Sequence, residues 1–552
     1  MAKQFSIFSR DQDLDQIKSH TFDLTVVGGG ITGAGIALDA ASRGLNVLLL
    51  EKADFASGTS NKSTKLIHGG LRYLKQFEFG LVKETGQERA IVHRLAPHLA
   101  IPEKMLLPFV TGGTYGSIST SVGLKVYDFL ADVLKKDRRI MLNKVKTLAA
   151  EPLLNKEIVE GGGVYSEYRT DDARLTIEVL KTAHNYEATL LNYAEVSSFT
   201  YSNGIVNGVV FEDKISGKEI TTKSKTVIVA AGPWLDTVLG KHELDIKKKL
   251  RLTKGVHLVV SHDKFPIKQP VYFDTPDERM IFAIPRGRTT YIGTTDTEYT
   301  GHLDRVVATQ DDLTYLLGAL KRVFPKVELS VKDVESNWAG LRPLIDEEGK
   351  KPSELSRKDE VYEMEDGLIA IAGGKLTGYR KMAQRVVDLA LTRLDLPHKI
   401  PCRTSLIPLT SDPFTNYTMV EKAISHYSDL AQKQGLDPDW GWHLITTYGS
   451  NAAIIWRNFT ESENDEDASL LTSELWYCVN YEMVASAADF LVRRSSRLYF
   501  DINGLIKYRE HVVDYLSLHF RWSKKRIKEE NTAIDLYLKD ATTYYQSENQ
   551  DS

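Results

Sequence analysis

The chain has 552 residues, of which 42% are hydrophobic and 26% charged, and its formal net charge is −4 with a sequence pI of about 6.4. This composition is ordinary for a globular protein, and the length suggests roughly three or four units of about 150 residues. The slightly acidic balance excludes a protein-wide basic field, so no nucleic-acid partner is expected.

The two cysteines, Cys402 and Cys478, form no C-x-x-C motif. A disulfide framework, a structural zinc site and a dithiol redox pair are therefore not expected, and we predict no metal. The N-terminus has no apolar segment typical of a signal peptide, and no run approaches the roughly 18 apolar residues of a membrane span. These observations predict a cytoplasmic chain that is soluble or lies on a membrane surface.

The first clear pattern is a β-α-β unit. Residues 1–20 are polar and predict a short leader with one or two helical turns. A buried strand follows from Asp23, the Ala- and Ile-rich segment Thr32–Arg43 predicts a helix, and Asn46–Leu50 predicts a second strand. Apolar runs on both strands indicate a parallel sheet that is covered on both faces.

Two later segments, Thr226–Gly232 and Gly367–Gly374, have the same apolar character and are predicted to return to this sheet. Between them, Leu252–Val260, Met280–Ile284 and Thr290–Thr294 alternate in polarity. That alternation predicts a second, inserted domain built on a mixed sheet with one face exposed to water.

The last third of the chain has a different pattern. A helix with a wide apolar stripe is predicted from Gly378 to about Leu394. Four prolines between residues 397 and 413 then mark a linker, and the remainder, to about residue 545, predicts consecutive helices.

The segment Gly28-Gly29-Gly30-Ile31-Thr32-Gly33 matches the dinucleotide-binding pattern G-x-G-x-x-G between the first strand and its helix. Gly28 allows a tight turn, Gly30 lets the backbone approach a pyrophosphate, and Gly33 allows the helix to pack closely on the strand. Glu51 ends the second strand, where a carboxylate binds ribose hydroxyls and repels the 2′-phosphate of NADP.

The motif alone does not distinguish FAD from NAD. Gly58–Lys65 supplies small hydrogen-bonding residues where an extended cofactor would continue, and Gly373–Gly378 is a second glycine-rich turn before a helix. Both features favour FAD, although both are also compatible with ordinary loops.

The segment Ser63–Tyr73 resembles the signature that follows the nucleotide motif in FAD-dependent glycerol-3-phosphate dehydrogenases. Further matches to that family are Asp171–Leu175, Gly232–Trp234, Lys254–His257, Ile292–Asp296, Gly340–Leu344, Gly373–Thr377, Tyr448–Asn451 and Val492–Arg494. They follow in order and extend over essentially the whole chain.

The resemblance implies an α/β and α+β fold: a Rossmann-like FAD-binding domain of the D-amino-acid and glycine oxidase type, an inserted mixed-sheet substrate domain and a C-terminal helical domain. We predict that residues 1–100, 150–240 and 340–395 form the first, 101–149 and 241–339 the second, and 396–552 the third. The expected cofactor-binding residues are Gly28, Gly30, Gly33, Glu51, Ser60, Ser63, Lys65, Gly69, Gly70, Gly232, Gly373, Gly374, Leu376 and Thr377.

The family resemblance also implies oxidation of sn-glycerol 3-phosphate to dihydroxyacetone phosphate. Hydride would pass from C2 to a noncovalent FAD, and electrons would pass on to a membrane quinone. The enzyme would then be peripheral on the inner face of the cytoplasmic membrane, and we expect a homo-oligomer.

The substrate is a phosphate dianion whose 2-hydroxyl must lose a proton, so the site needs cations and a base. The expected substrate-binding residues are Arg72, Tyr73, Arg342, Arg357, Lys375 and His68. His257, Arg342 and Lys375 are the predicted catalytic residues, with His257 as the first choice of general base because neutral imidazole is available at pH 7. His68 is the alternative base, and Arg342 could stabilise the alkoxide.

An apolar helix face over Leu124–Leu134, followed by the basic run Lys135–Arg139, suits contact with an anionic lipid surface, as does Lys524–Arg526. Both runs are equally compatible with ordinary solvated surface. Three rival functions stay open: an oxygen-using glycerophosphate oxidase, disfavoured because no long polar insertion is visible; an FAD amine or amino-acid oxidase; and a non-catalytic flavin-binding module.

Overall fold

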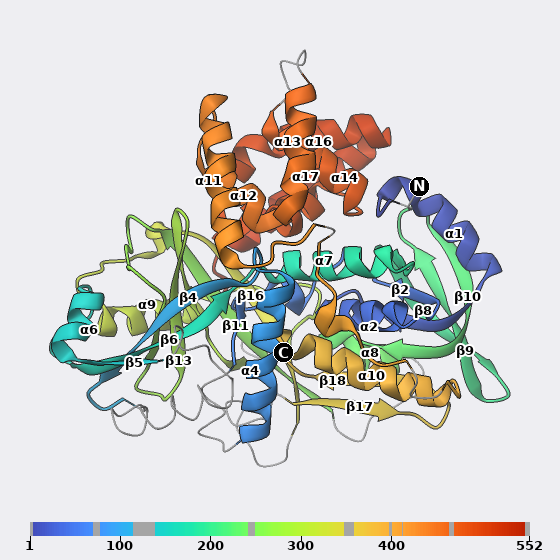
Figure 1. The fold of residues 1–552 in the computed structure, drawn as a ribbon, viewed down its shortest axis with the longest axis horizontal. Coiled ribbons are helices and arrows are strands. Elements are labelled where there is room, and N and C mark those ends of the chain that lie inside the picture. Colours follow the sequence, from blue (N-terminus) through green and yellow to red (C-terminus); the bar gives the residue numbers. More distant parts are fainter. Residues whose placement is uncertain are drawn as a thin grey trace.

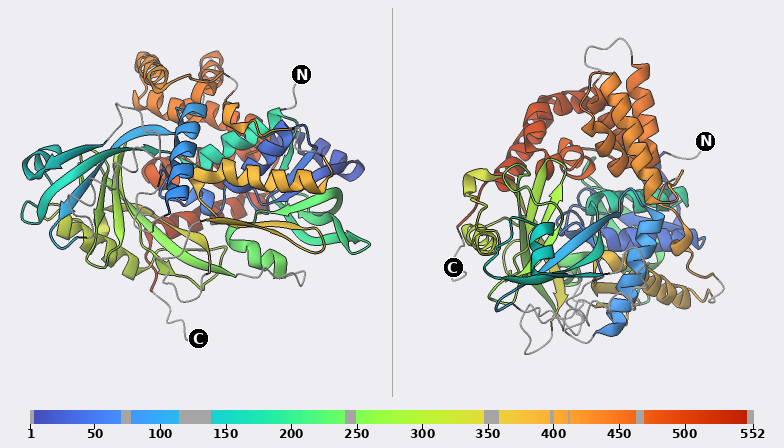
Figure 2. Two further views of the ribbon diagram at one scale, coloured as in Figure 1. Left: turned by 60° about the horizontal axis from the view of Figure 1, so that its bottom comes forward. Right: turned by 60° about the vertical axis from the view of Figure 1, so that its left-hand side comes forward.

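The computed structural model describes residues 4–69, 78–113, 139–240, 249–346, 358–396, 400–410, 412–462 and 469–546. Two β-sheets stand side by side, and the C-terminal helices stack on one side of the body that the sheets form (Figures 1 and 2). Among the described residues, no helix is both long enough and apolar enough to cross a bilayer.

The N-terminal leader contains more helix than predicted. Helix α1 (Arg10–Ser19) has ten residues, preceded by a 3₁₀ turn over Ile7–Ser9. The polar sequence offered little sign of how this helix is held in place. Leu14 and Ile17 are buried, and Arg10 pairs with buried Asp213 at 2.6 Å.

The first sheet confirms the predicted β-α-β unit and both predicted returns to it. Its order is β17-β18-β10-β1-β2-β7, and all neighbours except β17 and β18 run parallel. The strands are β1 (Thr21–Val27), β2 (Val47–Leu50), β7 (Thr189–Leu191), β10 (Lys218–Val229), β17 (Asp359–Glu363) and β18 (Ile369–Gly373). Strands β8 (Ala194–Ser202) and β9 (Ile205–Asp213) extend the sheet antiparallel from β10.

Helix α2 (Ile31–Ser42) packs against α7 (Asp172–Asn185) and α10 (Tyr379–Arg393). It lies very close to the turn that precedes it, because a Cβ atom on Gly33 would lie 1.9 Å from the carbonyl oxygen of Gly28. The predicted role of Gly33 in close packing is therefore confirmed. Helix α10 buries the wide apolar stripe expected of it.

The second sheet has the order β15-β11-β14-β13-β12-β4-β6-β3, with β16 paired to β11 and β5 to β6. Its strands are β3 (Leu66–Ile67), β4 (Ile101–Val110), β5 (Ile140–Asn143), β6 (Val159–Arg169), β11 (Leu250–Ser261), β12 (Val271–Asp274), β13 (Met280–Arg286), β14 (Thr289–Gly293), β15 (Thr297–Glu298) and β16 (Val334–Ile345). The predicted mixed sheet is thus present, and it also takes in β3 and β6 from stretches predicted to belong to the first domain.

The prediction of one wet face on this sheet is wrong for its central strands, since β14 is buried throughout. Leu258 and Ile292 lie in a cluster with α9 (Gln310–Val323), whereas Val259 and Tyr291 lie in a cluster that includes C-terminal helices. Each face of the central strands is therefore covered, one by α9 and the other by residues that include the C-terminal helices.

The predicted C-terminal helical unit is confirmed. Its helices are α11 (Tyr417–Lys433), α12 (Asp439–Tyr448), α13 (Ala452–Glu461), α14 (Leu470–Tyr481), α15 (Arg497–Phe500), α16 (Ile502–Phe520) and α17 (Lys524–Thr542), with a π-helical segment over Asp489–Arg494. Helix α4 (Phe79–Leu95), α6 (Lys144–Ala150) and α8 (Leu235–Gly240) complete the described helices.

A buried ion cluster joins this unit to the first sheet. Asp54, in the loop after β2, accepts hydrogen bonds from the Arg493 Nε atom and from Arg494 at 2.7 and 2.9 Å. Asn192 donates another at 3.1 Å. Burial alone would raise the pKa of Asp54, but the charges of Arg494 and Arg493 lower it to about 2.

We expect Asp54→Asn to destabilise the protein by about 3–5 kcal/mol, because two buried guanidinium groups lose their carboxylate. Thermal unfolding measures the loss, with Asp15→Asn as the control because the Asp15 carboxylate is 79% exposed in a surface pair. The pKa of Asp54 in the folded protein lies below its ordinary value of 3.8. The extra stability of the wild type over Asp54→Asn is therefore complete above pH 3.8 and is lost as the pH falls toward 2. Equal unfolding temperatures for the two variants would contradict a structural role for the pair.

Candidate active site

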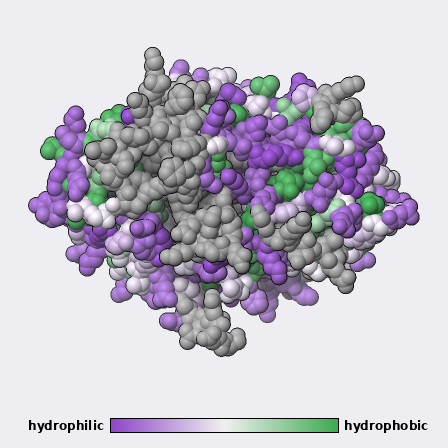
Figure 3. Space-filling view, turned by 90° about the horizontal axis from the view of Figure 1, so that it is seen from below, coloured by the Kyte–Doolittle hydropathy of each residue, from purple (hydrophilic) through white to green (hydrophobic). Residues whose placement is uncertain are grey.

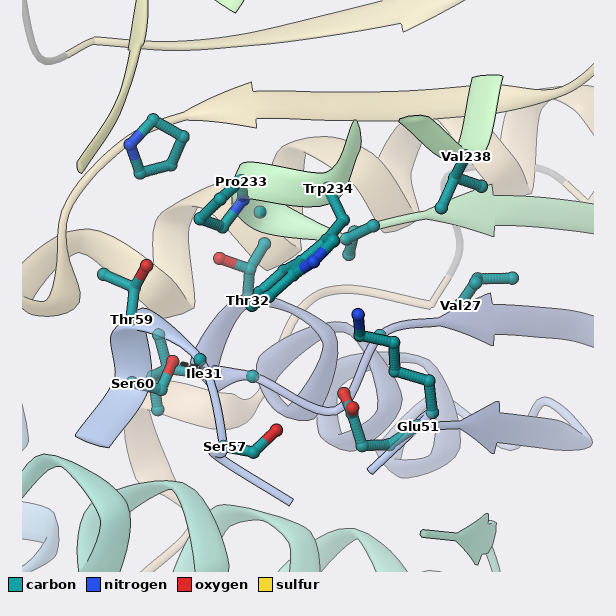
Figure 4. Close-up of a pocket in the computed structure, with 18 of the residues that line it drawn as sticks. Val27, Ile31, Thr32, Glu51, Ser57, Thr59, Ser60, Pro233, Trp234 and Val238 are labelled. Carbon is teal, nitrogen blue, oxygen red and sulfur yellow. Dashed lines mark hydrogen bonds between the residues drawn. The ribbon is translucent and has the colours of Figure 1, made fainter. Parts of the chain in front are cut away.

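A long pocket runs along the carboxyl ends of the first sheet. Its lining passes from Ala194–Val196, past Glu51 and the N-terminus of α2, to Gly373–Leu376. The residues enclose about 1330 Å³, part of it open to solvent. In Figure 4, Glu51 and Ser57 lie on one side of this pocket, and Pro233, Trp234 and Val238 lie on the other.

The glycine-rich turn has the geometry predicted from its sequence. Gly28 has a φ of +115°, and a Cβ atom on it would lie 2.5 Å from the carbonyl oxygen of Ala230. Gly30 caps α2 without a side chain of its own, and Ser60 supplies the missing acceptor because its Oγ atom receives the Ile31 N–H at 2.9 Å. Ser60 therefore fixes the first turn of the helix that faces the pocket.

Glu51 is fixed at the end of β2. One carboxylate oxygen accepts the Gly29 N–H at 2.6 Å, and the other accepts the Ala53 N–H at 3.0 Å. Burial raises the pKa of Glu51, and these two hydrogen bonds lower it only in part. The carboxylate keeps further lone pairs for hydroxyl groups of a ligand.

The opposite end of the pocket is built from the second glycine-rich turn. Gly373 and Gly374 both have positive φ values, +72° and +87°, which favour glycine. Thr377 then joins this turn to the loop after β3, because its hydroxyl donates to the His68 carbonyl at 3.0 Å and accepts the His68 N–H at 3.1 Å.

A second, smaller pocket opens beside this end. Both pockets share Thr59, Pro343, Gly374, Lys375 and Leu376. The second pocket is lined in addition by Lys62, Ser63, Thr64, Leu66, His68, Gly255, His257, Gly340, Leu341, Arg342, Leu344 and Thr377. The structure therefore brings together four residues that were predicted to bind substrate or to act in catalysis and that come from separate parts of the chain: His68, His257, Arg342 and Lys375.

His257 lies on β11 between two neighbours in register, Gly293 on β14 and Trp338 on β16. Its ring stacks on the Trp338 indole with a centroid distance of 4.6 Å and an angle of 12°. The Nε2 atom lies 3.1 Å from the Thr64 hydroxyl, and Nδ1 has no hydrogen-bond partner among the described residues. Burial, then the charges of Arg342 and Lys65, lower the pKa of His257 well below its usual value, so the ring is neutral at pH 7.

Arg342 projects from β16 and is held in place by the loop after β14. Its Nη2 atom donates to the Thr294 hydroxyl at 2.8 Å, and its Nη1 atom donates to Asp296 at 3.3 Å. Gly255 makes room for the guanidinium, because a Cβ atom there would lie 2.2 Å from Arg342 Nη2. A Cβ atom on Gly293 would likewise lie 2.1 Å from the His257 ring.

The remaining predicted residues are distributed as follows. Ser63 lines the second pocket and Gly232 the first. Lys65 and Gly69 line neither of these two pockets. The Lys65 ammonium is buried and lies 2.5 Å from the Asp172 carboxylate. The residues Gly70, Arg72, Tyr73 and Arg357 lie outside the described part of the chain, as do Leu124–Leu134 and Lys135–Arg138.

Sequence reasoning did not identify Thr64, Thr294, Asp296 and Trp338, the residues that position His257 and Arg342. The available signal was the pair of glycines Gly255, within β11, and Gly293, at the end of β14. A glycine within a strand often marks the close approach of another group.

Comparison with known proteins gives a consistent result. A family model described as FAD dependent oxidoreductase matches residues 23–380, and one described as the C-terminal domain of alpha-glycerophosphate oxidase matches residues 415–527. The aerobic glycerol-3-phosphate dehydrogenase of Bacillus subtilis is 47% identical over 549 residues, covering 98% of this chain and 99% of the relative.

Solved structures agree. The glycerol-3-phosphate dehydrogenase of Bacillus halodurans, complexed with FAD, is 41% identical with a TM-score of 0.84, covering 99% of this chain and 100% of that one. The glycine oxidase of Bacillus cereus, 21% identical, has a TM-score of 0.51 and covers 68% of this chain and 96% of that one. The second likeness concerns the fold alone, and it confirms the predicted fold class.

We expect Gly255→Ala to reduce activity about 100-fold, because the added methyl group displaces the Arg342 guanidinium from Thr294. The matched control is Gly318→Ala on α9, where a Cβ atom meets nothing within 4 Å. Steady-state kinetics of the purified variants measure the effect. Full activity of Gly255→Ala would show that this placement of Arg342 is unimportant.

Proposed function

The chain belongs to the FAD-dependent oxidoreductases, in the family of the aerobic glycerol-3-phosphate dehydrogenases, and we propose on this basis that it oxidises sn-glycerol 3-phosphate to dihydroxyacetone phosphate. The observation that carries the proposal is the second pocket, beside one end of the long pocket, whose lining includes three cationic residues and two histidines: Lys62, Arg342, Lys375, His68 and His257. A phosphorylated alcohol needs that combination of charge and proton acceptor.

The residues of the long pocket fit FAD. The N-terminus of α2 offers a positive helix end to a pyrophosphate, and Glu51 offers carboxylate oxygens to a ribose. The lining continues to Gly373–Leu376 at the mouth of the second pocket, which suits an elongated dinucleotide with its reactive ring at that end. When bound there, FAD supplies the acceptor for the hydride from substrate C2.

We propose that Arg342 and Lys375 bind the substrate and offset its negative charge. Arg342 is rigid because Thr294 and Asp296 hold its guanidinium, and a rigid fork suits oxygen atoms of phosphate or of a developing alkoxide. Lys375 lines both pockets, so its cation lies between substrate and cofactor. The predicted contacts from Arg72, Tyr73 and Arg357 stay proposals.

We propose His257 as the acceptor of the proton from the substrate 2-hydroxyl. Its ring is neutral, it lines the substrate pocket, and its Nδ1 atom has no partner among the described side chains. His68 lines the same pocket and is the alternative acceptor, although its backbone rather than its ring is fixed by Thr377.

The electron acceptor and the cellular location are further proposals. The full-length relatives are named dehydrogenases rather than oxidases, which supports an acceptor other than oxygen, and we propose a membrane quinone. The described residues on the face seen in Figure 3 are mainly hydrophilic with small apolar patches. We propose that docking on the inner face of the membrane depends on charge. Basic residues Lys525 and Arg526 of the predicted Lys524–Arg526 run start α17, with Lys525 88% exposed. Flotation with anionic liposomes tests lipid contact, and light scattering tests the expected homo-oligomer.

Anaerobic addition of sn-glycerol 3-phosphate is expected to bleach the flavin absorbance of the purified protein, whereas glycerol and amino acids leave it unchanged. Arg342→Ala should slow this bleaching by at least about 100-fold, since one fixed cation is lost from the reacting region. Gly318→Ala serves again as the control. Unbleached flavin in the wild-type protein would overturn the substrate assignment.

Readmission of air or of a soluble quinone to the reduced protein then identifies the acceptor. Fast reoxidation by the quinone with little peroxide is the expected result. Stoichiometric peroxide would replace the dehydrogenase proposal with that of an oxidase.

The imidazole of His257 is expected to stay neutral in the substrate-free protein at pH 6, about half a unit below the ordinary histidine pKa, because burial and two cations disfavour its protonated form. Nuclear magnetic resonance of protein labelled with ¹⁵N in its 14 histidines measures this. The His257→Gln variant assigns the signal. A ring that becomes protonated near pH 6.5 would contradict the burial described above.

A further inference from the structure

The orientation of the His257 ring depends on Trp338. The two residues are cross-strand neighbours on β11 and β16, and their rings are nearly parallel. On the other side of His257, Gly293 has no side chain, and the His257 ring occupies the space that a Cβ atom there would fill. The Thr64 hydroxyl holds one edge of the His257 ring, and the Trp338 indole supports its face, so the position of the ring depends on that of Trp338 as well.

The Trp338 indole is held from two directions. Its Nε1 atom donates to the Ser63 carbonyl at 3.2 Å, which ties it to the loop beside the substrate pocket. Its ring also lies 5.2 Å from that of Tyr499 and 5.7 Å from that of Phe500, both at the end of α15. Only 3% of Trp338 is exposed, and the Tyr499 and Phe500 rings help to bury it.

The same two residues are fixed to the sheet that carries the site. The Ser336 hydroxyl of β16 donates to the Tyr499 carbonyl at 2.6 Å. The Phe500 ring lies 5.8 Å from that of Tyr291, which itself lies 6.5 Å from the His257 ring. Phe500 therefore contacts both aromatic rings that neighbour His257.

The segment from Arg493 to Phe500, which ends with these two aromatic residues, is anchored at its start on the cofactor side. Arg493 and Arg494, a few residues before α15, bind the buried carboxylate of Asp54 in the loop after β2. The segment from Arg493 to Phe500 thus spans from the loop that follows Glu51 to the wall of the substrate pocket.

We propose that the C-terminal helical unit positions the proton acceptor of the active site: Tyr499 and Phe500 hold the Trp338 indole, and the indole fixes the His257 ring. The inference rests on the proposed role of His257. It makes Tyr499, Phe500 and Trp338 positioning residues, since none of them lines the cofactor pocket or the substrate pocket and they act through the His257 ring. It also gives the helical unit a part in catalysis.

The test compares one substitution at two half-buried phenylalanines of the helical unit. Phe500→Leu removes the ring beside Trp338, whereas Phe459→Leu removes a ring that packs on Trp456 elsewhere in the unit. Phe500→Tyr retains the ring and serves as the conservative rescue. Each holoprotein is mixed with sn-glycerol 3-phosphate without oxygen, and the rate of flavin bleaching is followed against substrate concentration.

For Phe500→Leu we expect the limiting bleaching rate to fall about tenfold, as is usual when a reacting group loses its alignment. The substrate concentration for half-maximal rate should change less than about twofold, because Arg342 and Lys375 stay in place. The His257 signal should also titrate at higher pH, since water reaches the ring while the charges of Arg342 and Lys65 are unchanged. Phe500→Tyr and Phe459→Leu should behave like the wild type.

A wild-type bleaching rate and titration in Phe500→Leu would overturn the inference. So would an equal slowing in Phe459→Leu, which would indicate general loosening of the helical unit. If Phe500→Leu does not fold, Trp338→Phe, which keeps a smaller ring on His257, replaces it, and a normal rate there has the same meaning. Failure of the proposed function is recognised separately, because the wild-type flavin would then not bleach at all.

Discussion

The position of the loop after β2 is the constraint on which both pockets depend, and the buried Asp54 carboxylate sets it. That loop carries Glu51 at its start and Ser60 further on, so it shapes the long pocket before it reaches the substrate side. A carboxylate without solvent is tolerated only when cations neutralise it, and both cations, Arg493 and Arg494, come from the far end of the chain. The cofactor loop and the helical unit therefore cannot fold independently into their observed positions.

The second sheet also depends on the C-terminal part of the chain. One face of its central strands packs on α9, and the opposite face meets residues of the C-terminal helices. His257 on β11 pairs with Trp338, and Arg342 on the neighbouring strand β16 pairs with Thr253, while Gly255 and Gly293 leave the space that the two site side chains occupy. The substrate wall is thus a sheet that is buried on both faces, which makes it stiff enough to fix two polar groups.

Local patterns in the sequence were sufficient for the strand-turn-helix of Gly28–Gly33, for both returns to the first sheet and for the helical tail, because each depends on neighbouring residues. The pairing of Arg10 with Asp213 and of Asp54 with Arg494 joins residues far apart in the chain, and no local pattern reports it. The same applies to Thr294, which orients Arg342. Residue type suggested the groups that are proposed to act, whereas the groups that hold them in place are visible only in the fold.

The charge of the site suits a dianionic substrate better than a neutral one. Without substrate, the fixed cations Arg342 and Lys65 and the burial of His257 all disfavour a protonated imidazole. In the proposed site, a phosphate dianion bound beside Arg342 would offset that cation and so would raise the pKa of His257. The imidazole would then be a better proton acceptor when the 2-hydroxyl is in place. An amino acid would offset Arg342 with one carboxylate charge and would bring a cationic ammonium group, so its effect on the pKa of His257 would be smaller. This difference favours a phosphorylated alcohol as the substrate over an amino acid.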